Sequence, residues 1–197
     1  MILSNVDLTS YEMRQLGIND EYGIHKLVYS MFPNSEDMQR DFLYLKRCGF
    51  RRNVNILVLS KRNPTIPDYC KISCKKIPDD YFDHSEYNFM VKVNPVKRSS
   101  ESTKLVPLIE YDEMIKWFCG KAEKSGMKVD PNRLDIQDKG VDRVSKGARE
   151  LIFNKATFVG NCTIVDKEAF IETFQKGFGR GKAFGFGLMQ IRPVSVF

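Results

Sequence analysis

Two halves of this chain repeat one order of strand-like and helix-like segments, and this repetition restricts the fold more than any single motif. Each half carries one amphipathic segment with the helical period, at 20–32 and at 111–124. Strand-like segments are predicted at 1–8, 42–46, 53–60, 69–77, 88–93, 128–136, 149–153, 156–165 and 188–191. Asp166 is expected to cap a further short helix that carries Phe170 and Phe174. The order predicts an α+β fold of two tandem ferredoxin-like (RRM-like) βαββαβ domains.

A polar stretch separates the two halves. Residues 97–104 read Lys-Arg-Ser-Ser-Glu-Ser-Thr-Lys and contain no apolar side chain, which is typical of a linker. The 197 residues suffice for two small domains. The sequence therefore predicts an N-terminal domain over 1–96, a linker over 97–104 and a C-terminal domain over 105–197.

Charge and cysteine content narrow the function classes. The formal net charge of +6 favours an acidic partner, nucleic acid before an anionic membrane surface. The five cysteines form no C-x-x-C pair, and the two histidines lie far from them, which argues against a zinc site. No apolar run approaches membrane-spanning length, and the first residues do not resemble an export signal. We therefore expect a cytoplasmic protein with reduced thiols, no cofactor and no membrane partner.

A glycine-rich segment, Gly177–Gly187, precedes the last predicted strand. It holds five glycines, the cations Arg180 and Lys182, and three phenylalanines. Glycine lets a polyanion approach the main chain closely, so this mixture suits a phosphate backbone. It matches neither the dinucleotide fingerprint nor the P-loop. A glycine-softened turn leading into the strand is the alternative interpretation.

One histidine lies on a predicted helix face that is not the core face. In the helix 20–32, the apolar residues that recur at helical spacing form the buried stripe; they are Ile24, Leu27, Val28 and Met31. His25 lies about 100° from Ile24 and shares a flank with Tyr22 and Tyr29. A solvent-facing cover for the core edge is the structural alternative. The other histidine, His84, lies among acidic residues that would repel phosphate.

The histidine suits RNA cleavage without a metal. Such cleavage needs a group that orients or deprotonates the 2′-OH and an acid that protonates the departing 5′-oxygen. A histidine, with an ordinary pKa of about 6.5, can be that acid at neutral pH. Tyrosine, with an ordinary pKa of about 10, is a better orienter of the 2′-OH than a base.

Four segments together resemble the CasE-type endoribonucleases, which process CRISPR repeat RNA within type I-E Cascade. The matching segments are Glu21–Pro33, Phe89–Arg98, Trp117–Gly126 and Gly177–Met189, in the order of the family. Val93 stands where alanine is frequent in the family, and Met189 stands where leucine is common.

The resemblance implies a fold, an activity and a set of site residues. The family has two ferredoxin-like domains, cuts at the base of the repeat hairpin without metal, leaves a 2′,3′-cyclic phosphate and stays bound to its product. Its catalytic histidine, with a tyrosine three residues earlier, corresponds to His25 and Tyr22. Expected partners are the CRISPR repeat hairpin or crRNA and other Cascade subunits, with target DNA met only through the assembled complex. The expected RNA-binding residues are Lys92, Asn94, Lys97, Arg98, Arg143, Lys146, Arg149, Lys155, Gly177, Gly179, Arg180, Gly181 and Lys182.

Several alternatives stay open at this stage. A non-catalytic RNA-hairpin-binding subunit of the same fold would share these basic residues. A metal-dependent nuclease is a more remote alternative, because carboxylates alone can hold Mg²⁺. Residues 94–98 also fit a solvated strand exit. The placement of Tyr22 and His25 together, off the core face, favours the enzyme.

Overall fold

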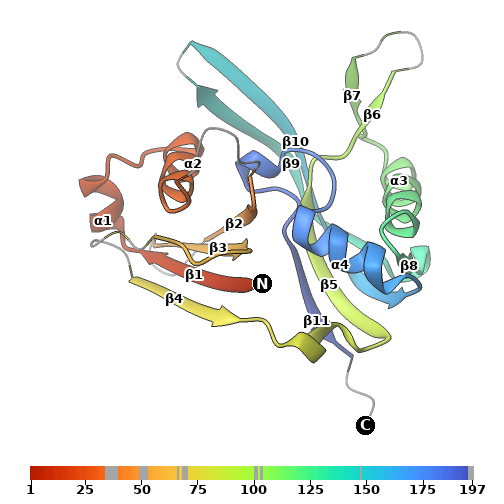
Figure 1. The fold of residues 1–197 in the computed structure, drawn as a ribbon. Coiled ribbons are helices and arrows are strands. Elements are labelled where there is room, and N and C mark those ends of the chain that lie inside the picture. Colours follow the sequence, from red (N-terminus) through yellow and green to blue (C-terminus); the bar gives the residue numbers. More distant parts are fainter. Residues whose placement is uncertain are drawn as a thin grey trace.

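The computed structural model describes residues 1–33, 40–48, 53–65, 67, 71–99, 102, 104–146 and 148–194, except for the side chains of Cys48 and Lys146. The chain forms two units, each built on its own antiparallel sheet (Figure 1). In Figure 1, helix α2 covers the N-terminal sheet on the left, and helices α3 and α4 lie beside the C-terminal sheet on the right.

The N-terminal unit has the strand order of a ferredoxin-like domain. It consists of β1 (Ile2–Leu8), α1 (Ser10–Gln15), α2 (Glu21–Ser30), β2 (Phe42–Cys48), β3 (Val54–Ser60) and β4 (Lys71–Lys76). The sheet order is β2-β3-β1-β4, and every neighbouring pair is antiparallel. The described residues between β3 and β4 include no helix. The four predicted strands and the helix that starts after Asp20 are confirmed, whereas the short helix α1 was not predicted.

The C-terminal unit has the same order with both helices present. It consists of β5 (Glu86–Val93), α3 (Tyr111–Glu123), β8 (Met127–Val129), β10 (Arg149–Ile164), α4 (Lys167–Lys176) and β11 (Met189–Pro193). The sheet order is β11-β5-β10-β8. With the N-terminal unit, it confirms the predicted tandem ferredoxin-like fold.

Two hairpins extend from the C-terminal unit. One joins β6 (Val96–Arg98) to β7 (Leu105–Pro107), and the other joins β9 (Asp135–Lys146) to the first half of β10. Both extend toward the top of Figure 1. Within the described residues, short 3₁₀ turns lie at Asp79–Phe82, Pro131–Arg133 and Lys182–Phe184. The turn at Pro131–Arg133 breaks the strand predicted at 128–136 in two. The two strands predicted within 149–165 are one strand, with an irregular register between Lys155 and Thr157.

The strand pairing corrects the predicted domain division. Strand β5, which was assigned to the N-terminal domain, pairs with β10 and β11 in the second sheet. Its alternate side chains from Tyr87 to Val93 are buried in the core beneath α3 and α4, because period-two alternation turns one whole face inward. Lys97 and Arg98, which begin the predicted linker 97–104, lie in β6 and pair with β7, since polar residues occur in an exposed hairpin as readily as in a linker. We propose instead that the units meet within 77–85.

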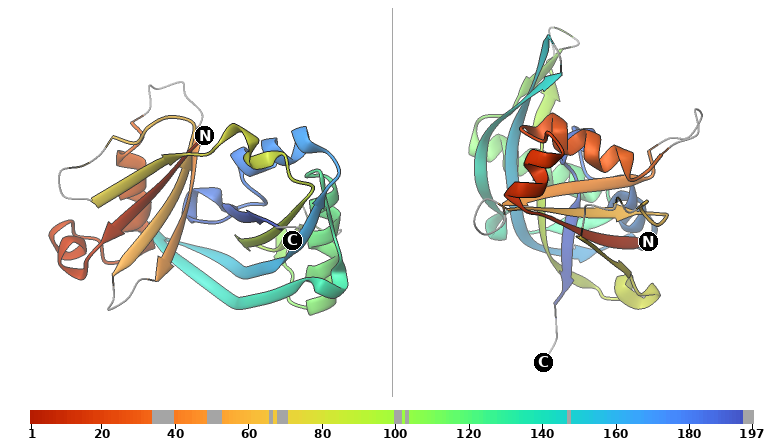
Figure 2. Two further views of the ribbon diagram at one scale, coloured as in Figure 1. Left: turned by 90° about the horizontal axis from the view of Figure 1, so that it is seen from below. Right: turned by 90° about the vertical axis from the view of Figure 1, so that its left-hand side faces the viewer.

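The strand β2 joins the two units through its two faces. Phe42 and Tyr44 pack in the cluster beneath α2, whereas Leu43 and Leu45 face the other way and pack in the core of the C-terminal unit. The two views of Figure 2 show the two sheets as separate layers that meet along one side. Strands β2 and β3 therefore have buried side chains on both faces of the sheet, whereas the edge strand β4 is largely exposed, and β2 lies against elements of the C-terminal unit.

Candidate active site and nucleic-acid interface

Helix α2 presents His25 on its flank, as the sequence predicted. The Asp20 side chain accepts a hydrogen bond from the Gly23 N–H at 2.8 Å and fixes the start of the helix. Ile24, Leu27 and Val28 are buried, whereas His25 is half-buried. The imidazole lies 5.5 Å from the Tyr22 ring and 4.2 Å from the Tyr29 ring, measured between centroids. The predicted row of three rings is therefore present.

The histidine is anchored by a main-chain carbonyl from the far end of the chain. His25 Nδ1 lies 2.7 Å from the carbonyl oxygen of Ala183, which belongs to the glycine-rich segment. A carbonyl oxygen can only accept, so Nδ1 carries the proton and donates. Nε2 is then the ring nitrogen that gains or loses a proton as the imidazole titrates. This arrangement fixes the tautomer and the ring orientation that an acid aimed through Nε2 requires.

The same carbonyl oxygen accepts a second hydrogen bond. Tyr44 Oη donates to it at 3.0 Å from strand β2. The Tyr44 side chain is almost fully buried. Burial raises the pKa of Tyr44, and the charges of Glu21 and Tyr29 raise it further, so the phenol remains a protonated donor.

Phenylalanines of the glycine-rich segment form the floor of the site. The Phe184 ring lies nearly parallel to the His25 imidazole, with centroids 5.0 Å apart. Phe153 of β10 contacts both Phe184 and Phe186, at 5.1 and 5.5 Å. These contacts connect α2 to the base of the β9–β10 hairpin, so the imidazole is held among aromatic rings from both units.

The glycine-rich segment is a packed turn whose glycines have a structural reason. Gly177 has φ +84°, and a Cβ there would lie 2.8 Å from Leu43 Cδ2. Gly187 has φ +82°, and a Cβ there would lie 2.5 Å from the Phe178 carbonyl oxygen. The N–H of Gly177 already donates to the Thr173 carbonyl. The turn interpretation therefore accounts for these two buried positions, while Gly179 and Gly181 are half-exposed.

Arg180 and Lys182 belong to a larger group of cations, which we name the α3–loop cluster. Its members share the surface formed by α3, the end of α4, the glycine-rich segment and the residue before Asp41; they are Arg40, Lys121, Lys124, Lys176, Arg180 and Lys182. Phe178 packs 4.9 Å from Phe118 of α3, which brings Arg180 close to Lys121. Burial lowers the pKa of Lys182, and the charges of Arg40, Lys176 and Lys121 lower it further.

Most of this cluster lacks a balancing carboxylate. Lys176 pairs with Glu172, and the other five cations form no ion pair with any residue in the described part of the chain. Like charges held together repel one another, and a bound polyanion would relieve that repulsion. The cluster therefore favours the binding of a polyanion. Sequence reasoning found Arg180 and Lys182 but missed Arg40, Lys121 and Lys124. A lysine on an exposed helix face carries no signal in sequence that distinguishes it from an ordinary solvated charge.

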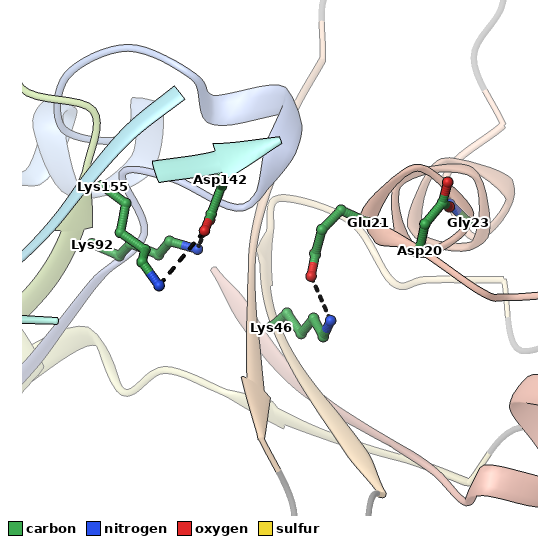
Figure 3. Close-up of polar contacts among 7 residues, drawn as sticks. All are labelled: Asp20, Glu21, Gly23, Lys46, Lys92, Asp142 and Lys155. Carbon is green, nitrogen blue, oxygen red and sulfur yellow. Dashed lines mark hydrogen bonds and ion pairs between the residues drawn. The ribbon is translucent and has the colours of Figure 1, made fainter. Parts of the chain in front are cut away.

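Other predicted RNA-binding cations are paired with carboxylates. Lys92 Nζ lies 2.6 Å and Lys155 Nζ lies 3.6 Å from Asp142 (Figure 3). Lys155 Nζ also lies 3.0 Å from Asp138. These groups line a cleft of about 360 Å³ between the units, which Glu21 and Lys46 border on the other side. The hydrogen bond with Asp138 raises the pKa of Lys155. In this state Lys92 and Lys155 are neutralised and are not brought together with the α3–loop cluster.

The remaining predicted residues lie on or near the two hairpins. Lys97 and Arg98 are exposed on β6, and Lys97 pairs with Glu113 at 2.8 Å. Asn94 is 8% exposed, and its Oδ1 is buried with no hydrogen-bond partner among the described residues. Arg143 and Arg149 are exposed at the β9–β10 hairpin, where Arg143 pairs with Glu150 at 2.9 Å. The side chain of Lys146 lies outside the described residues.

Two further features of the described residues bear on the site. No group of three or more His, Cys, Asp or Glu side chains among them is arranged to hold a metal ion. None of the helices in these parts of the chain is both long enough and apolar enough to cross a bilayer.

Comparison with known proteins gives one family and several relatives. A family model described as "CRISPR associated protein" matches residues 1–193. The CRISPR system Cascade subunit CasE of Escherichia coli (strain K12) is 24% identical over 188 residues, which cover 89% of this chain and 93% of the relative. The CRISPR-associated endoribonuclease Cse3 of Thermus thermophilus is 30% identical over 115 residues, which cover 53% of this chain and 54% of the relative.

A solved structure has the same fold. The structure of the CRISPR endoribonuclease Cse3 bound to a 19-nucleotide RNA matches with a TM-score of 0.85 and 20% identity, covering 98% of this chain and 100% of that chain. At this identity, the likeness establishes the tandem ferredoxin-like architecture.

Proposed function

The chain belongs to the CRISPR-associated protein family, and from that membership we propose that it is an endoribonuclease that cleaves CRISPR precursor RNA within the repeat hairpin. Its relatives carry the names of a Cascade subunit and an endoribonuclease, and a neighbour in fold was solved with RNA bound. The proposed partners are accordingly the repeat hairpin, the crRNA that remains bound after cleavage, and other Cascade subunits. Target DNA would be met only through the assembled complex.

The anchoring of His25 carries the catalytic part of this proposal. With Nδ1 bound to the Ala183 carbonyl, the proton on Nε2 is the one that can be passed to a substrate. In the proposed step, the 2′-oxygen forms a bond to the adjacent phosphorus and passes its proton to a solvent water molecule. The bond from phosphorus to the 5′-oxygen breaks, and Nε2–H protonates that oxygen. The products are a 2′,3′-cyclic phosphate and a free 5′-OH.

Tyr22 and the cations take supporting roles in the proposal. The Tyr22 ring lies beside the imidazole, where its hydroxyl can orient the 2′-OH. The α3–loop cluster includes Lys182, the residue next to Ala183, so uncompensated positive charge adjoins the His25 anchor. We propose that the RNA backbone lies along this cluster, since phosphate contacts supply most of the affinity for nucleic acid. The three cysteines whose side chains the structure describes are free thiols, which is consistent with the cytoplasm as the proposed location.

The second candidate function is a subunit that binds the RNA hairpin without cutting it. The same cations would serve it, and a half-buried histidine among aromatic rings can be an ordinary part of the packing. The placement of Tyr22 beside His25 on the flank of α2, and the name of the Thermus thermophilus relative as an endoribonuclease, favour the enzyme.

One experiment separates the two functions. The purified chain is incubated with its repeat RNA in EDTA, and the product ends are analysed. We expect cleavage at one position with a 2′,3′-cyclic phosphate. A substrate with 2′-deoxyribose before the scissile bond should bind but remain intact, since the internal nucleophile is missing. Binding without cleavage of either RNA would favour the binding subunit, and cleavage restored only by Mg²⁺ or Mn²⁺ would indicate a metal-dependent nuclease.

A further inference from the structure

One carbonyl oxygen receives hydrogen bonds from two side chains of the N-terminal unit. Ala183 O accepts from His25 Nδ1 at 2.7 Å and from Tyr44 Oη at 3.0 Å. Both donors come from elements that are fixed by the cluster beneath α2, in which the Tyr44 side chain is 2% exposed. The acceptor belongs to a 3₁₀ turn in the C-terminal unit, so its position relative to α2 depends on what holds that turn.

Tyr44 holds the turn by contact as well as by its hydroxyl. Gly185, directly after the turn, has φ +79°, and a Cβ there would lie 3.3 Å from Tyr44 Cε2. The absence of a side chain lets the main chain lie against the phenol ring. On its other side the turn is closed by the bond from the Phe184 N–H to the Gly181 carbonyl. The Ala183 carbonyl is thus presented to His25 by a segment that rests on Tyr44.

We propose that Tyr44 is a positioning residue for the cleavage reaction, acting through the Ala183 carbonyl on the imidazole of His25. The inference rests on the proposed function. Tyr44 is buried and does not reach substrate; its phenol fixes the acceptor that selects the Nδ1–H tautomer and aims Nε2. Without the Tyr44 hydroxyl, the Ala183 carbonyl loses the hydrogen bond from Tyr44 and keeps the one from His25. The turn and the His25 imidazole can then shift together.

A double-mutant cycle tests this inference. Single-turnover cleavage and RNA affinity are measured for wild type, Tyr44→Phe, His25→Ala and the double variant. Tyr44→Phe removes only the hydroxyl, and we expect the rate to fall roughly 3- to 10-fold, the share of one ordinary hydrogen bond, with unchanged affinity. In the His25→Ala background, Tyr44→Phe should change the remaining cleavage rate less than about 2-fold. A residue that acts through His25 has no effect on the rate when His25 is absent.

A matched variant controls for the loss of a buried phenol. The side chain of Tyr87 is also buried, and its hydroxyl donates to a main-chain carbonyl, that of Tyr81, at 2.7 Å. Tyr87→Phe should therefore lower thermal stability like Tyr44→Phe yet leave the cleavage rate unchanged. Equal rate losses for Tyr44→Phe in both histidine backgrounds would overturn the inference, as would a Tyr44→Phe variant that cuts at the wild-type rate.

A measurement on the wild type does not depend on the variants folding. Nitrogen chemical shifts of the His25 ring should show the neutral form protonated at Nδ1, and a form protonated at Nε2 would overturn the inference. Failure of the proposed function gives a different result: wild-type protein that leaves repeat RNA intact, or His25→Ala that cuts normally. Those results overturn the catalytic assignment and the positioning role together. A cleavage defect in His25→Ala with a wild-type rate in Tyr44→Phe overturns only the role of Tyr44.

Discussion

The imidazole of His25 and the ring of Phe184 come from opposite ends of the chain and lie nearly parallel, with centroids 5.0 Å apart and planes inclined by 20°. Phe184 follows the residue whose carbonyl anchors Nδ1, so the same turn supports the ring on one face and at one nitrogen. The glycine-rich segment thus takes part in positioning the histidine.

The contact between Phe184 and His25 predicts a defect in rate. Phe184→Leu keeps an apolar side chain but removes the stacked ring, so cleavage should slow by roughly 3- to 10-fold, the worth of one aromatic pair. RNA affinity should change little. The control is Phe82→Leu, because Phe82 is buried against Phe170 and Phe174 in the core of the C-terminal unit. Equal rates for Phe184→Leu and wild type would show that the stacked ring does not support the imidazole.

The α3–loop cluster predicts a dependence of RNA binding on salt. Lys121→Ala and Arg180→Ala should each weaken binding and reduce the slope of log affinity against log salt by about one, since each removes one phosphate contact. The matched control is Lys128→Ala, which removes an exposed lysine on β8 that is not a member of the cluster. If Lys128→Ala and Lys121→Ala have the same slope as wild type, the RNA does not lie along this surface.

Tyr22 can either orient the 2′-OH or remove its proton, and these two roles predict different losses of cleavage rate in Tyr22→Phe. If its hydroxyl only orients the 2′-OH, Tyr22→Phe keeps the ring beside His25 and should slow cleavage less than His25→Ala does. Measured single-turnover rates at saturating protein decide this. A loss as large as that of His25→Ala would instead assign to Tyr22 the removal of the 2′-OH proton.

Local sequence signals predicted local structure well. The Asp20 cap and the apolar spacing of Ile24, Leu27 and Val28 fix the helix and hence the flank on which His25 lies, because they act within one element. The repeated order of strand-like and helix-like segments also predicted the tandem ferredoxin-like fold, whereas the order of the strands within each sheet comes from the structure. The strand predicted at 88–93 was placed in the N-terminal domain, but it pairs in the second sheet, because the residues of a strand do not determine which sheet it joins.

The surroundings of the site could not be predicted, for a physical reason. The partner of His25 lies 158 residues away and is a main-chain carbonyl, which any residue type could supply. The neutralisation of Lys92 by Asp142 joins residues 50 apart, so sequence analysis counted Lys92 as an available cation. The glycines pointed to a phosphate contact in sequence, whereas Gly177 and Gly187 are needed for close packing. Pairings made by tertiary structure decide which charges are available.

The most direct test of this account is the effect of His25→Ala on cleavage and on binding, measured separately. The matched control is His84→Ala, which changes the other histidine, an exposed residue outside the site. We expect His25→Ala to fold, to bind repeat RNA within a few-fold of wild type, and to cleave roughly 10²-fold more slowly or worse, the usual share of a general acid. A folded His25→Ala protein that cuts as fast as wild type and His84→Ala would contradict the assignment of His25 as the catalytic acid.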